Sequence, residues 1–322
     1  MFAQQPEVER LLVVINPAST NFKQVNHYVI DRLDDSSWRN KYETFVTEDP
    51  RNGANNSARI GERLLPHTAL VVPAGDGSIG EAASGMDQTE DEVRNTGFLL
   101  PLPYGSGNDT VRSIHGRVRN INVLDVLNRG VEFPLDLLQI KTDKKHRTGV
   151  GSASMGWTAD GTMKIGEPDK REAKKTSIIP DKLLDANTLA RLALKERFPA
   201  FKYSEGMEPN REASEMLFSN LPYMAGGVVK IEESRPGKMV CIEIGPEKFT
   251  TNVLKRFATE RFLGGFRGTH LATRTIELET DANLNVDGEG SALAAGTIVS
   301  FAVKADRVRA IALPKRHHLS LA

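Results

Sequence analysis

Short strand-like segments alternate with helically spaced apolar residues over the first 130 residues of this 322-residue chain. Strands are expected at residues 11–15, 42–47, 69–73 and 98–102, and helices at residues 22–33, 54–65, 80–86 and 121–128. Several of the strands are uninterrupted apolar runs, which is typical of strands covered on both faces. The alternation therefore predicts an α/β domain with an open, mostly parallel sheet and helices on both faces.

The pattern changes after Gly130, where strand-like segments follow one another with few helices between them. Strands are expected at residues 133–140, 148–154, 216–221, 239–244, 274–278, 284–286, 298–303 and 308–313, and helices at residues 187–198 and 251–262. The polar stretch 164–182 is expected to form a mobile insertion or lid. We predict an α/β domain over residues 1–130, to which residues 306–322 return, and a β-rich, sandwich-like domain over residues 131–305.

Two glycine-rich loops each follow an expected strand of the first domain, and each carries an aspartate. They read Ala74-Gly75-Asp76-Gly77-Ser78 and Gly105-Ser106-Gly107-Asn108-Asp109. Such loops expose backbone N–H groups and let phosphate oxygens approach closely. An aspartate repels phosphate, so it holds Mg²⁺, polarises a hydroxyl or fixes the loop. Because ligands bind beyond the carboxyl ends of parallel strands, both loops and Asn16-Pro17 are expected at one edge, as a phosphoryl-transfer site.

Each of these motifs also has a simpler structural interpretation. Asp-Gly and Gly-Ser are common turn dipeptides, and Asn108 or Asp109 could cap the next helix. The segment Asp287-Gly288-Glu289 could be a hairpin turn, or it could bring a carboxylate from the second domain onto the first. Asp136 interrupts an apolar strand, where it needs a partner or a metal if buried, and water if it lies at the strand mouth.

The composition excludes several classes of protein. Lys plus Arg and Asp plus Glu are both 42, and a net charge of zero argues against broad nucleic-acid binding. A single cysteine, Cys241, excludes an internal disulfide and a Cys-based zinc site, and we expect it to be buried. No apolar run approaches the length of a membrane span, and no secretory signal is visible, so we expect a cytoplasmic protein.

Taken in order, the motifs resemble the diacylglycerol kinase catalytic-domain family, which includes bacterial lipid kinases, sphingosine kinases and ceramide kinases. The resemblance covers roughly residues 10–314. The matching segments are Asn16-Pro17, Ala74-Gly75-Asp76-Gly77-Ser78, Gly105-Ser106-Gly107-Asn108-Asp109, Leu135-Asp136-Leu137, Gly226-Gly227 and Asp287-Gly288-Glu289. Any one motif is modest evidence, but the ordered set together with the change of domain is specific.

The resemblance implies a first domain like that of NAD kinase and phosphofructokinase, with ATP bound between the two domains. The nucleotide-binding residues that it implies are Asn16, Thr47, Ala74, Gly75, Gly77, Ser78, Gly80, Ser106 and Gly107. It implies Glu289 as the base that takes the proton of a lipid hydroxyl. It also implies that Asp76, Asp109 and Asp136 form an acidic network with Mg²⁺, in which Asp76 and Asp136 serve catalysis.

We therefore expect an ATP-dependent lipid kinase that phosphorylates a primary hydroxyl of a diacylglycerol- or sphingoid-type lipid, with peripheral contact to a membrane. Three departures from the family pattern leave alternatives open, of which Ser78 in place of Thr keeps the hydroxyl. Ala74 replaces a glycine, which would cost about 1 kcal/mol at a positive φ. Gly80 replaces Asn or His, so one contact near the phosphates is missing. The alternatives are a soluble kinase like NAD kinase and a catalytically impaired nucleotide- or lipid-binding homologue. The sequence leaves open whether the protein forms an oligomer.

Overall fold

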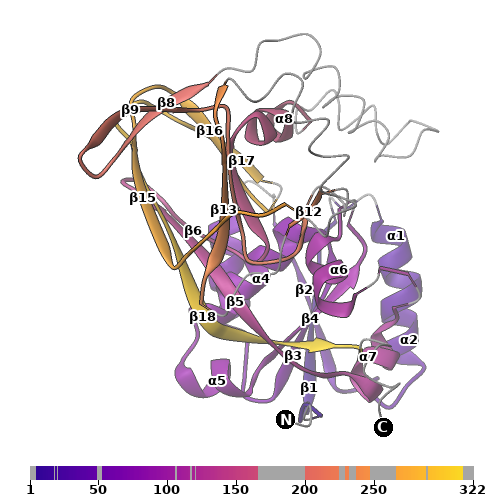
Figure 1. The fold of residues 1–322 in the computed structure, drawn as a ribbon. Helices are drawn as coiled ribbons and strands as arrows, with labels where there is room; N and C mark the ends of the chain where they lie inside the picture. Colours follow the sequence, from indigo (N-terminus) through magenta and orange to yellow (C-terminus); the bar gives the residue numbers. More distant parts are fainter. Residues whose placement is uncertain are drawn as a thin grey trace, which may run out of the picture. The chain divides into compact units, whose positions relative to one another are not determined.

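The computed structural model shows a chain that divides into two compact units (Figure 1). It describes residues 5–17, 19, 21–48, 53–105, 107–116, 118–119, 121–165, 200–224, 229–231, 237–246, 266–287 and 289–314. The first unit holds the described residues up to Leu137 and from Ala305 onward, and the second runs from Leu138 to Lys304. The expected domain boundary, between residues 130 and 131, lies seven residues earlier in the chain.

The first unit is built on a parallel sheet, as the alternation of strands and helices predicts. Its strands are β1 (Arg10–Ile15), β2 (Tyr42–Val46), β3 (Thr68–Ala74) and β4 (Phe98–Pro103), in the order β2-β1-β3-β4. The last part of β18 (Ile298–Ala312) adds a further parallel strand, with Ala310 opposite Leu99. Nearly every residue of β1, β3 and β4 is buried, which explains why these strands read as continuous apolar runs.

Helices are present at each of the four places where the apolar spacing predicts them, but the helices at Asp91–Thr96 and Asp109–His115 were not predicted. The helices of this unit are α1 (Phe22–Val25), α2 (Asp31–Asp34), α3 (Gly53–Gly61), α4 (Asp76–Asp87), α5 (Asp91–Thr96), α6 (Asp109–His115) and α7 (Val123–Arg129). A π-helical segment, η1 (Asn26–Ile30), joins α1 to α2, so the single helix expected there is not regular. The expected start of α4 at Gly80 is wrong, because the helix begins four residues earlier, at Asp76.

The second unit is β-rich and mostly antiparallel. Its strands are β5 (Val131–Thr142, from Leu138), β6 (His146–Gly149), β7 (Ser152–Gly156), β8 (Phe201–Glu205), β9 (Glu208–Ala213), β10 (Glu215–Ser219), β11 (Tyr223–Met224), β12 (Val229–Lys230), β13 (Met239–Ile244), β14 (Thr269–Leu271), β15 (Thr273–Leu278), β16 (Ala282–Val286), β17 (Glu289–Leu293) and β18 up to Lys304. One sheet has the order β14-β13-β10-β7-β16-β17, and another runs from β18 through β15 and β8 to β9.

Side chains from both sheets of the second unit pack into one core. Phe218 of β10 stacks on Phe301 of β18 with ring centroids 3.8 Å apart, and Tyr203, Met155 and Leu284 belong to the same buried cluster. The β-rich, sandwich-like unit is therefore confirmed. Cys241 is buried on β13, as expected.

Several expected elements of the second unit are wrong in detail or cannot be compared. The strand expected at 148–154 is two strands, because the chain bends at Val150 and Gly151. The strands expected at 298–303 and 308–313 are one strand, β18, and α8 (Trp157–Ile165) was not predicted. Outside the described residues lie the expected helices 187–198 and 251–262, residues 166–182 of the expected lid, Ser106, and the pair Gly226-Gly227. Among the described helices, none has the length and apolar character needed to cross a bilayer.

Candidate active site

Four expected site segments follow the carboxyl ends of neighbouring parallel strands. Asn16 follows β1, Thr47 follows β2, Gly75 follows β3, and Gly105 lies two residues after β4. The chain leaves β1 to form β2 on one side of it and later adds β3 on the other side. The switch point between β1 and β3 is where ligands bind in open α/β sheets. A hydrogen bond from Asn16 Nδ2 to Ser78 Oγ (3.1 Å) spans this point.

The first glycine loop is shorter than the sequence suggests, because α4 begins within it. Gly75 is the N-cap residue of this 12-residue helix, and as a glycine it supplies no side-chain cap. The uncapped N–H groups and the helix dipole at such an end favour an anion. Gly77, Ser78 and Gly80 therefore belong to the first two turns of a helix, and the site has the character of a helix N-terminus rather than of an extended loop.

The Asp76 carboxylate is directed at the backbone of the second loop. Its Oδ1 accepts a hydrogen bond from the Thr110 N–H (2.9 Å), and its Oδ2 accepts one from the Asp109 N–H (3.2 Å). These are the first two residues of α6, whose own N-cap residue, Asn108, makes no capping bond with its side chain. Asp76 thus caps α6 from a neighbouring helix, which is the loop-fixing role among the three that the sequence left open.

The two glycine loops are in direct contact. A Cβ atom placed on Gly105 would lie 2.2 Å from the Cα atom of Gly75, so no other residue fits at position 105 without moving the backbone. Asn108 closes the turn, because its Oδ1 accepts the Gly105 N–H (2.9 Å) and its Nδ2 donates to the Gly105 carbonyl oxygen (2.6 Å). Gly107 lies inside this turn.

Asn108 is a site residue that the sequence analysis did not single out for this role. It adopts a left-handed backbone conformation with φ of 58°. Asparagine tolerates this conformation better than most residues, because its short side chain bonds locally to the backbone. The signal in the sequence was an Asn placed directly before an expected helix and after two glycines.

The backbone strain that a positive φ would cause at Ala74 is absent. Ala74 is the last residue of β3, is buried, and is not among the residues with positive φ. Its replacement of glycine therefore carries no conformational penalty of the kind expected. Gly80 is buried within α4, and the neighbouring Glu81 is held by Asn56, whose Nδ2 donates to Glu81 Oε2 (3.2 Å).

Thr47 lies at the same edge and presents an unusual polar atom. Its N–H donates to the Ile15 carbonyl oxygen (2.9 Å), which extends the pairing of β1 and β2 by one residue. Its hydroxyl oxygen is buried and has no hydrogen-bond partner among the residues that the structure describes. A buried hydroxyl without a partner is uncommon in folded proteins, and ligand sites are one setting in which it occurs.

The three expected magnesium ligands do not form one cluster. Within the described part of the chain, no three His, Cys, Asp or Glu side chains are grouped closely enough to hold a metal ion. Asp136 lies half-buried on β5, where its Oδ1 accepts the N–H of Asp306 (2.8 Å). Asp76, Asp109 and Asp136 are therefore not gathered into a site made of three protein carboxylates.

Glu289 is the first residue of β17, in the second unit, and its backbone pairs with Val286 of β16. The meeting of Glu289 with Asp76, which the resemblance implies, stays a prediction.

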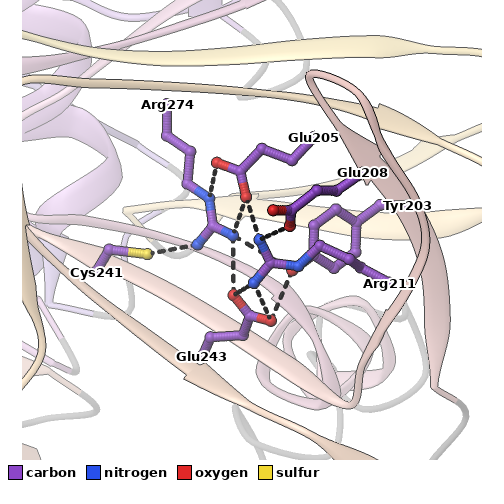
Figure 2. A network of polar contacts seen from close by, with 7 residues as sticks. All are labelled: Tyr203, Glu205, Glu208, Arg211, Cys241, Glu243 and Arg274. Atoms are coloured by element: carbon purple, nitrogen blue, oxygen red, sulfur yellow. Dashed lines mark hydrogen bonds and ion pairs between the residues drawn. The ribbon is translucent and has the colours of Figure 1, made fainter.

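The second unit also contains a dense polar network, drawn in Figure 2. Arg274, whose side chain is 6% exposed, donates to Glu205 at both Oε1 (3.1 Å) and Oε2 (2.8 Å), to Glu243 (2.8 Å) and to the Cys241 sulfur (3.0 Å). Arg211 bonds to the same two glutamates. The network borders a cavity of about 400 Å³.

Electrostatics shows that the groups of this network satisfy one another. Burial by itself would raise the pKa of Glu243, but hydrogen bonds from Tyr203 and Arg274 outweigh burial and lower it. Burial likewise would lower the pKa of Arg274, whereas its bonds to Glu205 raise it. Burial raises the pKa of the Cys241 thiol despite the nearby guanidinium. We interpret the network as structural, since each charge has partners of the opposite sign.

Comparison with known protein families finds a match for the first part of the chain. Residues 10–140 match the family model described as the diacylglycerol kinase catalytic domain, and this region belongs to that family. The region includes both glycine loops and Asp136. No curated protein sequence matches the chain.

Solved structures extend the likeness to nearly the whole chain. The fold is similar to that of a diacylglycerol kinase from Bacillus anthracis str. Sterne, with a TM-score of 0.66 and 15% sequence identity, covering 98% of this chain and 100% of that one. Two further structures from the same organism give TM-scores of 0.66 and 0.64 at 16% identity, covering 96% and 95% of this chain and 98% of each of theirs. At this level of identity the likeness shows the fold alone.

Proposed function

We propose that this protein is an ATP-dependent lipid kinase that phosphorylates a primary hydroxyl of a diacylglycerol- or sphingoid-type lipid at a membrane surface. One observation carries the proposal: two interlocked glycine loops at the switch point of a parallel sheet, inside a region of the diacylglycerol kinase catalytic-domain family. Phosphoryl transfer depends mainly on positioning and charge, and this arrangement supplies both.

The nucleotide phosphates would bind at the N-terminus of α4. Backbone N–H groups after Gly75 point out of an uncapped helix end, and the hydrogen bond from Asn16 fixes the Ser78 hydroxyl beside them. The buried Thr47 hydroxyl lies at the end of the adjacent strand. Asp76 holds the start of α6 next to the N-terminus of α4. Its carboxylate accepts hydrogen bonds from two backbone amides, which reduces its repulsion of a bound phosphate.

Magnesium fits this site as an ion shared between protein and phosphates. Mg²⁺ commonly takes one or two carboxylates and completes its octahedron with phosphate and water oxygens. We keep Asp76, Asp109 and Asp136 as its candidate ligands, and the ion would neutralise charge that develops on the transferred phosphoryl group.

Glu289 is the proposed general base. A primary hydroxyl is a poor nucleophile, and a carboxylate placed beside it accepts its proton during attack. In this proposal Glu289 takes the proton from the lipid hydroxyl while the nucleotide phosphates are held by the first unit.

Transfer of radiolabelled phosphate from ATP tests the proposal. Purified protein with Mg²⁺ is offered phosphatidylcholine vesicles that contain diacylglycerol, sphingosine or ceramide, and in parallel NAD. We expect label on a lipid, and at least about a hundredfold slower transfer by Glu289→Gln. Glu277→Gln, a change at an exposed glutamate of β15, is the matched control. Label on NAD alone, or ATP binding by calorimetry without any transfer, would contradict the lipid kinase.

A further inference from the structure

Asp287 is a buried aspartate that holds three backbone amides at once. Its Oδ2 accepts the N–H of Val150 (2.6 Å), and its Oδ1 accepts those of Gly151 (3.0 Å) and Ser152 (2.8 Å). The residue is 7% exposed and adopts a left-handed conformation with φ of 47°. Asp287 lies in the turn of the β16–β17 hairpin, where Val286 pairs with Glu289, so the simpler interpretation of this motif as a hairpin turn is confirmed and accounts for the left-handed conformation. The burial of the carboxylate and its three accepted amides go beyond what a hairpin turn needs.

The surroundings of Asp287 are shaped to receive its carboxylate. A buried carboxylate is stable only when donors replace its hydration, and three amides supply them here. A Cβ atom placed on Gly149 would lie 3.0 Å from Asp287 Oδ2 and 2.9 Å from Val286 Cγ1. The bend between β6 and β7 is thus built closely around this side chain, and it is the same bend that divides the single strand expected there.

This anchor lies at the start of the strand that carries Glu289. Asp287 directly follows β16, and Glu289 begins β17 opposite Val286. The N–H of Asp287 also donates to the Ser152 carbonyl oxygen (2.9 Å), and Val286 pairs with Ala153 of β7. The backbone at Val286 and Asp287, next to the strand that Glu289 begins, is therefore tied to β7 and the bend before it through both the main chain and the Asp287 carboxylate.

We propose that Asp287 is the positioning residue of Glu289: it fixes the backbone that carries the proposed base, without touching substrate itself. This inference rests on the proposed function of Glu289. A base displaced by about 1 Å loses much of its effect, so a loosened anchor should appear as slower transfer.

The variant Asp287→Asn tests the anchor directly. Asparagine also tolerates the left-handed conformation, but it offers an NH₂ group where the carboxylate accepted an N–H. We expect kcat for the lipid to fall about 10- to 100-fold, with KM for ATP within about twofold of wild type. Gly149→Ala, which pushes a methyl group against the carboxylate, should slow transfer in the same way even if Asp287→Asn folds poorly.

Two controls separate positioning from general damage. Asn210→Ala perturbs another left-handed residue of the same unit, in the β8–β9 hairpin with φ of 58°, and should leave kcat unchanged. In a Glu289→Gln background, Asp287→Asn should cause no further loss, because Asp287 acts only through Glu289. A further loss there as large as in the wild-type background would overturn the proposal.

The possible failures are distinguishable. If wild type is active and Glu289→Gln is not, full activity of Asp287→Asn shows that Asp287 does not position the base. If wild type phosphorylates no lipid, the proposed function fails and the catalytic part of this inference fails with it. Hydrogen exchange decides the anchor in either case: the amides of Val150, Gly151 and Ser152 should exchange at least about tenfold faster in Asp287→Asn, and unchanged exchange would refute the anchor.

Discussion

At the scale of single residues, two aspartates of the candidate site motifs have carboxylates that accept hydrogen bonds from the backbone. Asp76 caps α6 through two amides, and Asp287 holds three amides of one bend. A carboxylate that accepts backbone N–H groups stiffens the segment that carries them, because the amides would otherwise lack partners. Both aspartates lie directly beside residues that we propose for phosphate binding or base catalysis, so these backbone bonds are expected to affect activity indirectly. Asp76 is in addition a candidate ligand of Mg²⁺.

The variant Asp76→Asn should show this indirect effect. Its NH₂ group would face one of the α6 amides, and we expect about 1–2 kcal/mol lower free energy of unfolding. Transfer should slow by about a hundredfold, since α6 and the second glycine loop lose their fixed position. Urea unfolding and the kinase assay measure the two quantities.

Asn122→Ala is the matched control for Asp76→Asn. Asn122 caps α7 by accepting the Asp125 N–H (2.8 Å), so its loss should cost about 1 kcal/mol of stability with no change in transfer. Equal losses of activity in the two variants would mean that Asp76 contributes only stability.

At the scale of elements, α8 depends on a buried glutamate of β10. Glu215 accepts hydrogen bonds from the Thr158 N–H (2.8 Å) and the Thr158 hydroxyl, at the first turn of α8. Complete burial raises the pKa of Glu215 to about 8, although the bonds from Thr158 oppose the shift. This helix packs against β16 and β17, and a Cβ atom on Gly290 would lie 2.4 Å from Met163 Sδ.

Glu215 should make stability depend on pH. Because the pKa of Glu215 is higher in the folded state (about 8) than that of a freely exposed glutamate (4.5), the folded state binds the extra proton between these values. The contribution of Glu215 to the free energy of unfolding is therefore fully present below pH 4.5 and should fall as pH rises toward 8, by at most about 1.4 kcal/mol per pH unit. Urea unfolding at pH 5, 6, 7 and 8 should show a smaller slope for Glu215→Gln than for wild type. Identical slopes would contradict the shifted pKa.

At the scale of the whole molecule, each unit has its own means of joining distant parts of the chain. In the first unit the parallel sheet brings residues near 16, 47, 75 and 105 to one edge. In the second unit, Arg274 on β15 of one sheet bonds to Glu243 and Cys241 on β13 of the other (Figure 2). The charged network therefore holds the two sheets together where their apolar core ends.

Replacement of Arg274 by methionine should destabilise the second unit strongly. It removes the more buried of the two guanidinium groups that Glu205 and Glu243 share and leaves them only Arg211 of this pair, and removing one partner of a largely buried ion pair costs up to about 3–5 kcal/mol. Arg10→Met is the control, because the Arg10–Glu43 pair (3.6 Å) is exposed and contributes at most about 1 kcal/mol. Chemical denaturation measures both, and equal effects would show that the network adds little.

The sequence by itself determined the architecture of this protein and the location of its candidate site. Apolar periodicity is local, so β1, β3, β4 and the change to a β-rich second unit were readable from the chain. The edge at which the glycine loops gather followed from the rule for parallel strands. Element ends were less readable, because α4 and β18 extend through residues whose local signals indicate turns.

Only the tertiary structure decided which atoms meet. Asp76 and Thr110 are 34 residues apart, and Asp287 and Val150 are 137 apart, so no local pattern records these hydrogen bonds. The need for glycine at position 105 likewise depends on Gly75, a neighbour only in space. The sequence specifies the chemical groups of each side chain, but the packing of distant segments determines which partners those groups meet. These partners decide whether an aspartate binds a metal, takes a proton or fixes a loop.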